Sequence, residues 1–327
     1  MVNYMQKGRS LAPKYCGVVD MNEYITQDFV KNVLPKRKRE SNKSTFGRVL
    51  LVCGSDSMRG AAALAARGAL RLGAGLVTLA SAKSVIDTLS ASLCEPIYLD
   101  VESGDLFKTA EKMQVIGLGC GLGTGETTAA WTAKFLSSAG APLILDADGI
   151  NVLEGHAHLL HQAKRPVLLT PHPLEFSRLS GLTVKAIQAD RAHIARTFAA
   201  EYGITLLLKG ANTVVTDGKT TLINPTGSSA LAKGGSGDAL FGMICALAAQ
   251  GTQLLEAAAI GLSSRNGRAA AGQNLFGIRR AAERSAGRSR ADPGGMGILK
   301  KNKKRPLCSL HKLECIPPIT LPFAEPV

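Results

Sequence analysis

The strongest constraint on the fold is a regular alternation of short apolar runs with helical stretches, which begins at Arg48. The runs are apolar throughout instead of alternating in polarity, which indicates strands buried on both faces, as in a parallel sheet. The Ala- and Leu-rich stretches between them indicate right-handed βαβ crossovers. We predict strands at Val49–Cys53, Leu76–Ala80, Val115–Leu118, Leu143–Leu145, Val167–Leu169 and Ile204–Leu208, and helices at Ala61–Leu72, Thr127–Ser138 and Val184–Tyr202.

Two further runs, Thr213–Val215 and Thr220–Ile223, flank Asp217-Gly218 and predict a hairpin at the sheet edge. The expected fold class is therefore a three-layer α/β domain with a mostly parallel central sheet and an edge hairpin, spanning residues 43–262. Residues 1–42 are expected to form an irregular leader. Residues 263–327 are basic and end in a proline-rich stretch, and we predict no regular structure for them.

The formal net charge of +14 raises the question of nucleic-acid binding. Between Ser263 and Val327 there are 13 Lys and Arg against 4 Asp and Glu, so nine of the net positive charges lie in this tail. The run Lys36-Arg37-Lys38-Arg39 adds to the charge near the other end. We interpret both as solvated basic ends and expect no nucleic-acid partner.

The seven cysteines are scattered and form no CxxC pair, which argues against a disulfide framework or a metal site and favours a cytoplasmic location. The neighbouring His156, His158 and His161 lack further ligands, so no protein-bound metal is expected there. No apolar run reaches the length of a membrane span, and the first ten residues contain no apolar signal core.

The most informative motif is Lys233-Gly234-Gly235-Ser236-Gly237-Asp238, which precedes the apolar helical stretch Ala239–Gln250. Glycines allow backbone amides to face a ligand, and a helix N-terminus attracts anions. This combination predicts a site for a phosphoryl group in transfer, with Asp238 placed to accept a hydroxyl proton. The simpler alternative is a glycine turn with an N-capping Asp.

Other motifs follow the predicted strands, and the carboxyl ends of parallel strands line ligand sites in such folds. Gly117–Gly123 is a weak phosphate-loop signal or a packing turn. His172, fixed between prolines, is a substrate contact or a surface residue. The run Lys209–Thr213 is a phosphate contact or a plain strand end. Asp146 and Asp148 could assist Mg²⁺ or cap a helix.

Taken together, these motifs resemble the carbohydrate-kinase-like NAD(P)H-hydrate dehydratases of the ribokinase-like superfamily. The resemblance covers about residues 36–262, and several independent motifs occur in the family's order. The matching segments are Lys43–Leu79, Gly119–Gly123, Leu145–Leu153, Leu169–Leu179, Leu208–Gly218 and Asn224–Gly251.

The resemblance implies a repair reaction catalysed by a lyase. Damaged NADH or NADPH carries water added across a ring double bond, and the family phosphorylates the hydroxyl of the S-form with ADP or ATP and then expels phosphate. Phosphate is a good leaving group and hydroxide a poor one. The motifs at His172 and Asp238 look like the bacterial, ADP-using branch.

The resemblance also assigns residues. It implies that Asp238 is the base on the hydrate hydroxyl and that Gly237 contacts the nucleotide. Lys209, Gly210, Ala211, Asn212 and Thr213 hold the AMP portion, and Ala61, Gly123 and His172 contact the hydrated dinucleotide. Mg²⁺ is expected with the nucleotide, and a homo-oligomer, commonly a tetramer, is implied.

The chain departs from the family pattern in two places. The first 40 residues are too short for the epimerase domain that many relatives carry, so we expect the dehydratase alone. After Ile260-Gly261-Leu262 the family pattern is lost, and we interpret the tail as the product of an altered reading frame. Such a tail would weaken the packing of the core.

Two other functions fit the same motifs. A small-molecule hydroxymethyl kinase of the ribokinase-like superfamily would begin with the same phosphoryl transfer but would accumulate a phosphorylated product. A non-catalytic nucleotide-binding protein with a basic interaction tail would bind nucleotide without turnover.

Overall fold

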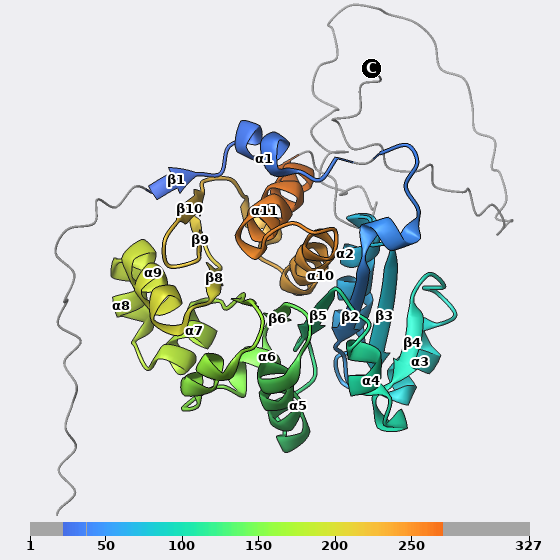
Figure 1. The fold of residues 1–327 in the computed structure, drawn as a ribbon. Helices are drawn as coiled ribbons and strands as arrows, with labels where there is room; N and C mark the ends of the chain where they lie inside the picture. The colour runs from blue at the N-terminus through green and yellow to red at the C-terminus, as the bar shows by residue number, and fades with distance from the viewer. Residues whose placement is uncertain (1–21, 37, 271–327) are drawn as a thin grey trace, which may run out of the picture. The chain divides into compact units, whose positions relative to one another are not determined.

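A single sheet organises the part of the chain that the computed structural model describes, which is residues 22–36 and 38–270 (Figure 1). Its ten strands follow the order β1-β10-β9-β8-β7-β6-β5-β2-β3-β4. The strands are β1 (Asn22–Tyr24), β2 (Arg48–Val52), β3 (Leu76–Ser81), β4 (Ile97–Asp100), β5 (Val115–Leu118), β6 (Leu143–Leu145), β7 (Val167–Leu169), β8 (Thr205–Leu208), β9 (Thr213–Thr216) and β10 (Thr221–Asn224).

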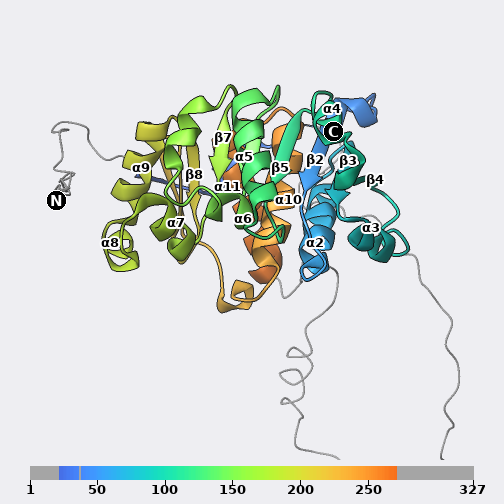
Figure 2. The same cartoon turned by 90° about the horizontal axis from the view of Figure 1, so that it is seen from below.

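Helices cover both faces of this sheet, so the predicted three layers are confirmed (Figure 2). Side chains of α1, α2, α3, α10 and α11 pack on one face, and those of α4 to α9 pack on the other. The helices are α1 (Gln27–Val33), α2 (Arg59–Arg71), α3 (Lys83–Leu89), α4 (Leu106–Ala110), α5 (Glu126–Ser138), α6 (Asp148–Asn151), α7 (Pro173–Ser180), α8 (Val184–Ala189), α9 (Arg191–Tyr202), α10 (Ser236–Ala249) and α11 (Leu254–Ala270). Short 3-10 turns are η1 (Lys43–Phe46), η2 (Val101–Ser103), η3 (Ala157–Gln162) and η4 (Ser229–Leu231).

Strand β2 shows why the apolar runs predicted buried strands. Val49 and Leu51 belong to the core beneath α2 and α10, whereas Leu50 and Val52 belong to the core beneath α5. All four side chains are fully buried. A strand with helices on both faces needs apolar side chains at every position, which is the pattern seen in the sequence.

The sheet is parallel except at β9, which runs antiparallel to both β8 and β10. The predicted hairpin is therefore confirmed as β9 and β10, but its position at the sheet edge is wrong. Strand β1 pairs in parallel with β10, with Glu23 opposite Leu222, and covers the hairpin. The polar sequence of β1 gave no strand signal.

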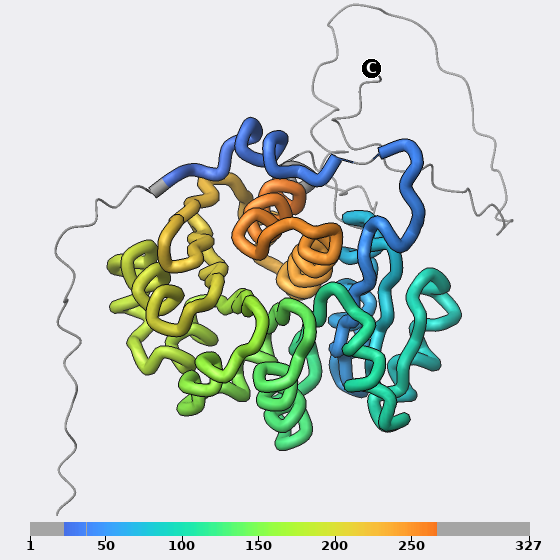
Figure 3. Tube along the Cα trace, viewed as in Figure 1, coloured from blue at the N-terminus to red at the C-terminus, as the bar shows by residue number. Residues whose placement is uncertain are grey.

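The prediction of an irregular leader is wrong for residues 22–33, whereas residues 34–36 and 38–42 contain no helix or strand. Residues 22–33 form β1 and α1, and the Thr26 hydroxyl caps α1 by accepting a hydrogen bond from the Phe29 amide at 3.1 Å. The blue segment runs alongside the orange helix α11 (Figure 3). Residues 1–21 and 37 of the predicted leader lie outside the described residues.

The predicted domain limit at Leu262 falls inside a regular helix, because α11 continues to Ala270. Asn266 is 3% exposed, and its amide donates to the Thr226 carbonyl at 2.9 Å and the Thr226 hydroxyl at 3.0 Å. The first turns of the predicted tail therefore pack on the domain. The remainder of the tail, residues 271–327, lies outside the described residues.

The helix predicted at Val184–Tyr202 is two helices. Asp190 separates α8 from α9 with an extended φ of −149°, and its carboxylate accepts a hydrogen bond from the His193 amide at 3.3 Å. An Asp at this place ends one helix and caps the next, which is the ordinary role of a short acceptor side chain at an N-cap.

None of the helices in the described ranges combines the length and the apolar character that a bilayer span requires.

Candidate active site

The glycine motif forms the entry to α10, as predicted. Gly235 adopts a φ of +86°, and a side chain there would also collide with Leu64. Helix α10 begins at Ser236, so Asp238 lies in its first turn, half-buried at the positive end of the helix. Asp238 does not cap α10 with its side chain, which removes the simpler interpretation of the motif.

Asp146, at the end of β6, forms the centre of a polar cluster beneath this turn. Its carboxylate is 1% exposed and lies 2.6 Å from the Lys209 ammonium, which reaches in from the end of β8. The Thr170 hydroxyl donates to the same carboxylate at 2.7 Å, and the Cys120 thiol donates to it at 3.3 Å. Three consecutive strand ends and the β5 turn thus converge on one buried carboxylate.

An unusual backbone turn directly follows Asp146. Ala147 has a φ of +49°, which is uncommon for a residue with a side chain. This turn directs Asp146 into the cluster while the next carboxylate, Asp148, accepts a hydrogen bond from the Gly123 amide at 2.8 Å. Neither Asp caps α6 with its side chain, so the helix-cap alternative for the pair is not what the structure shows.

Lys209 and Asp146 hold each other in their charged forms. Burial alone would raise the pKa of Asp146, but the Lys209 charge and the hydrogen bonds outweigh burial and lower the pKa. Burial likewise opposes the charge of Lys209, and the carboxylates of Asp146 and Glu175 raise the pKa of Lys209. A fixed ammonium is thereby available at neutral pH. A Cβ added at Gly237 would lie 3.5 Å from its Nζ, so this lysine adjoins the glycine turn.

Asp238 lies beside this pair, and its pKa is shifted in the opposite direction to that of Asp146. Burial raises its pKa, and the negative charge of Asp146 raises the pKa further, against smaller opposing effects of the Cys120 thiol and Lys209. A carboxylate whose pKa is raised is a stronger base than an ordinary Asp. Asp238 is therefore the member of the cluster that is suited to accept a proton.

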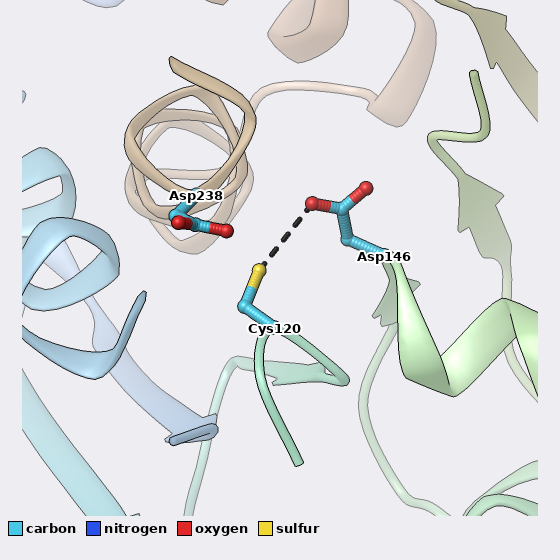
Figure 4. Close-up of side chains that lie close together, drawn as sticks. All are labelled: Cys120, Asp146 and Asp238. Carbon is cyan, nitrogen blue, oxygen red and sulfur yellow. Dashed lines mark hydrogen bonds between the residues drawn. The ribbon is translucent and has the colours of Figure 1, made fainter. Parts of the chain in front are cut away.

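Cys120 is a residue that the sequence analysis did not single out. Ligand atoms of Cys120, Asp146 and Asp238 all lie within 4.8 Å of one another (Figure 4). Burial, followed by the charges of Asp146 and Asp238, raises the pKa of the Cys120 thiol, so the thiol remains a neutral hydrogen-bond donor. A cysteine inside a glycine run carries no sequence signal for this role.

Mg²⁺, the ion expected with the nucleotide, prefers six oxygen ligands and usually retains waters and substrate phosphates. Sulfur is a poor ligand for this ion, and one Asp146 oxygen already faces Lys209. The chain therefore offers no complete cage within this cluster. The carboxylates of Asp146 and Asp238 could still bind an Mg²⁺ ion that arrives with a nucleotide phosphate. The residues therefore fit a nucleotide-bound ion.

The glycine run after β5 serves as a close-packing turn. Gly119 has a φ of +135°, and a Cβ there would lie 1.9 Å from the Asp146 carbonyl. Gly121 faces α2 in the same way, with an added Cβ 2.9 Å from that of Ala61. Gly121 thus lies beside Ala61 and Gly119 beside Asp146, whereas the roles of Ala61 and Gly123 as substrate contacts stay predictions.

His172 caps α7. Its Nδ1 accepts hydrogen bonds from the amides of Leu174 and Glu175, both at 3.1 Å, and Nε2 lies 3.1 Å from a Glu175 oxygen. Burial and the nearby Lys209 charge lower the pKa of His172, so the ring is neutral with its proton on Nε2. Its side chain is 46% exposed, which leaves part of the ring open to a substrate.

The predicted nucleotide segment after β8 divides into two parts. Lys209 points into the polar cluster, whereas Gly210, Ala211 and Asn212 form an exposed turn. Asn212 adopts a φ of +52°. Thr213 is buried, and its hydroxyl donates to the Gly210 carbonyl at 2.7 Å, which closes the turn.

Comparison with known proteins points to one family. A family sequence profile described as NAD(P)H-hydrate dehydratase matches residues 49–281. The ADP-dependent (S)-NAD(P)H-hydrate dehydratase of Bacillus subtilis is 39% identical over 229 residues, covering 68% of this chain and 79% of that protein. The enzyme of the same name from Neisseria meningitidis is 37% identical over 234 residues, covering 70% and 78%.

Longer relatives match as well. The bifunctional NAD(P)H-hydrate repair enzyme of Moorella thermoacetica is 38% identical over 250 residues, covering 72% of this chain. The match covers 47% of that protein, so this chain spans about half the length of the bifunctional relative.

Solved structures agree with the sequence comparison. The crystal structure of the ADP/ATP-dependent NAD(P)H-hydrate dehydratase from Bacillus subtilis, co-crystallized with ATP/Mg²⁺, superposes with a TM-score of 0.70 at 32% identity. The alignment covers 82% of this chain and 96% of that one. A ribokinase-like superfamily protein from Enterococcus faecalis superposes with a TM-score of 0.68 at 28% identity, covering 81% and 93%.

The family profile extends 19 residues beyond Leu262, where the sequence analysis placed the end of the resemblance. It covers more than two thirds of the chain and includes every strand end that contributes to the polar cluster. The chain therefore belongs to the NAD(P)H-hydrate dehydratase family.

Proposed function

We propose that this chain is an ADP-dependent (S)-NAD(P)H-hydrate dehydratase, which restores NADH or NADPH from the hydrated dinucleotide. The observation that carries the proposal is the pairing of Asp238, a carboxylate of raised pKa, with the α10 N-terminus and the Lys209 ammonium. A base, an anion site and a fixed cation are the parts that phosphoryl transfer to a hydroxyl requires.

In the first step, Asp238 accepts the proton of the hydrate hydroxyl while the hydroxyl oxygen forms a bond to the terminal phosphorus of ADP. The bond from that phosphorus to the bridging oxygen breaks, and AMP leaves. The amides at the start of α10 and the Lys209 ammonium stabilise the charge on the transferred group. Attack is favoured because the pair with Asp146 fixes Lys209 before the nucleotide arrives.

In the second step, the carbon–oxygen bond of the phosphate ester breaks and phosphate leaves with the bonding electrons. Loss of a proton from the neighbouring ring carbon restores the double bond. The overall change converts hydrate and ADP into NAD(P)H, AMP and phosphate. With ATP as donor, the nucleotide product would be ADP.

Mg²⁺ would supply charge neutralisation on the phosphates of the nucleotide. Asp238 and Asp146 are the carboxylates of the cluster that could take part in holding it. Lys209, Gly210, Ala211, Asn212, Thr213 and Gly237 are proposed to bind the nucleotide, and Ala61, Gly123 and His172 are proposed to contact the hydrated dinucleotide.

The proposal is tested by incubating the purified chain with hydrated NADH, Mg²⁺ and either ADP or ATP, while following the absorbance of the reduced nicotinamide ring. We expect recovery of that absorbance with stoichiometric release of phosphate. A stable phosphorylated product without recovered absorbance would instead identify a kinase. Nucleotide binding without any product would identify a non-catalytic protein.

We also infer a homo-oligomer, a tetramer by family resemblance, and a cytoplasmic location. Light scattering on the eluate of a sizing column measures the first, and a monomer at micromolar concentration would contradict it.

A further inference from the structure

Arg191, the first residue of α9, reaches across to the turn between β8 and β9. Its Nη2 donates to the carbonyl of Leu208 at 2.9 Å and to the carbonyl of Lys209 at 3.1 Å. Its Nη1 donates to the side-chain oxygen of Gln188 at 3.0 Å. One guanidinium therefore fastens two consecutive peptide groups at the base of the proposed nucleotide segment.

The turn is shaped around this guanidinium. Gly210 has a φ of +145°, and a Cβ added there would lie 2.9 Å from Nη2 and 3.2 Å from Cζ of Arg191. A side chain at this φ would be strained and would also require the guanidinium to shift. The backbone of Gly210 thus rests against Arg191 while the exposed turn continues through Ala211 and Asn212.

In the part of the chain that the structure describes, Arg191 has no partner of opposite charge. Among the described residues, no carboxylate lies within ion-pair distance of it, and its buried Nε has no hydrogen-bond partner. Burial lowers the pKa of Arg191. Burying a cation without a counter-charge costs free energy. A purely structural role therefore does not explain well why position 191 is an Arg.

We infer that Arg191 is a positioning residue of the nucleotide site: it fixes the peptide groups of Leu208 and Lys209, and its uncompensated charge favours an anionic nucleotide on the adjoining Gly210–Asn212 turn. The inference rests on the proposed function, because it takes this turn as part of the nucleotide site. The ligand class is a nucleoside diphosphate or triphosphate.

Two substitutions separate the two parts of this role. Arg191→Lys keeps the positive charge but cannot bond two carbonyls in a fixed planar fork. Arg191→Met removes both the charge and the hydrogen bonds while keeping an unbranched side chain. Lys185→Met, on the exposed surface of α8, is the matched control, since it removes one positive charge away from the turn.

The probe is ADP, titrated calorimetrically into the full chain at two salt concentrations. We expect Arg191→Met to raise the Kd of ADP on the order of tenfold and to flatten its salt dependence. Arg191→Lys should raise the Kd about threefold and keep the salt dependence of the original chain. The KM of the hydrate should stay within about twofold in both variants, which a general loss of structure would not produce.

An ADP Kd within about twofold of the original value in Arg191→Met, or a matching rise in Lys185→Met, would overturn the inference. If Arg191→Met does not fold, Arg191→Lys decides alone, because unchanged ADP affinity in that variant also overturns it. Calorimetry needs no turnover of hydrate. If the original chain binds ADP but does not repair the hydrate, the proposed function is wrong. The effect of Arg191 on ADP binding is then still decided by calorimetry on the variants.

Discussion

At the scale of single residues, the cluster assigns opposite tasks to two carboxylates that face one cation. Asp146 is buried, paired with Lys209 and held ionised, whereas Asp238 is only half-buried and has a raised pKa. Environments that push two neighbouring carboxylates apart in pKa are a common basis for acid–base chemistry. We propose that Asp146 orients the cluster and that Asp238 reacts.

The raised pKa of Asp238 makes a prediction about pH. In the proposed mechanism the ionised form of Asp238 is the base, so hydrate turnover should fall as the pH drops through the pKa of Asp238. The acid limb of the rate profile should therefore lie above the ordinary Asp value of about 3.9. ADP binding measured at each pH is the control. A limb at or below the ordinary value would contradict the assignment.

The raised pKa of Asp238 also affects the stability of the fold, which should decrease, and not increase, as the pH rises. Because the folded pKa of Asp238 is above its unfolded value, the folded state favours the protonated form, and stability is lost as the pH rises from the unfolded pKa through the folded one. Asp238→Asn should accordingly melt at least as high as the original chain at neutral pH. A fall in its Tm would show that the carboxylate is needed for folding.

Gly237 supplies a second prediction at this scale. In Gly237→Ala the new Cβ would lie 3.5 Å from Lys209 Nζ, an ordinary contact, so the fold should tolerate it. Helix propensity would even favour Ala by up to about 1 kcal/mol. The methyl group would nevertheless occupy space beside the ammonium where we place the phosphate. We expect the Kd of ADP to rise about tenfold or more, measured by calorimetry.

Gly140→Ala is the control for this variant, because an added Cβ there meets no atom within 4 Å and the residue is far from the strand ends that form the cluster. Unchanged ADP affinity in Gly237→Ala would place the phosphate elsewhere.

At the scale of elements, the position of Asp238 depends on the close packing of α10 against α2. A Cβ at Gly242 would lie 1.9 Å from the Ala65 carbonyl, and one at Gly68 would lie 2.4 Å from the Ala239 carbonyl. The two backbones therefore touch at both glycines. Ala239 follows Asp238 directly, so this contact sets where the Asp238 carboxylate lies.

Gly242→Ala is expected to destabilise the chain by about 1–3 kcal/mol or more, because backbone atoms must move to admit the methyl group. Displacement of α10 should also lower turnover by more than the loss of folded protein explains. Chemical denaturation and turnover at a temperature well below the Tm measure the two effects. Gly60→Ala, an open position on α2, should be neutral or slightly stabilising.

Little change in stability for Gly242→Ala would mean that α10 can shift freely on α2. The account of how Asp238 is held would then be wrong.

The same scale shows what could be predicted from sequence. The central strands were predicted because burial on both faces demands unbroken apolar runs, as in β2. The outer strands were missed because they are short and half-covered: β1 is polar, and Ile97 of β4 is 53% exposed. An edge strand does not need the pattern that identifies a central one.

In the candidate site, the glycine-rich turns at the strand ends could be selected from the sequence, because phosphate sites have a local signature of this kind. Cys120 and Arg191 could not. Each acts through a partner distant in the sequence, Asp146 for the thiol and Leu208 for the guanidinium. Single side chains without a motif acquire such roles only from the tertiary fold.

At the scale of the whole molecule, the sequence past Leu262 is part of the folded domain as far as the structure describes it. Asn266 is buried on α11 and holds Thr226, in the segment that leads from β10 toward the glycine turn. The interpretation that the chain loses its core packing after Leu262 therefore does not apply to these first turns.

Asn266→Ala removes two hydrogen bonds to Thr226 and should lower the free energy of unfolding by about 1–3 kcal/mol. The Thr226 carbonyl still accepts a hydrogen bond from the side-chain Nδ2 of Asn224 at 3.2 Å, which limits the loss of stability. Urea denaturation measures the change, with the exposed Gln253→Ala as control. Equal stability of Asn266→Ala and the original chain would show that this contact does not support the domain.

We propose above all that Asp238 is the base of a phosphorylation-driven dehydration. The most direct test compares Asp238→Asn with the original chain for recovery of NADH from its hydrate at saturating ADP and Mg²⁺. We predict a loss of turnover of about 10²–10⁴-fold, with ADP affinity kept within about threefold. Full activity in Asp238→Asn would contradict the account.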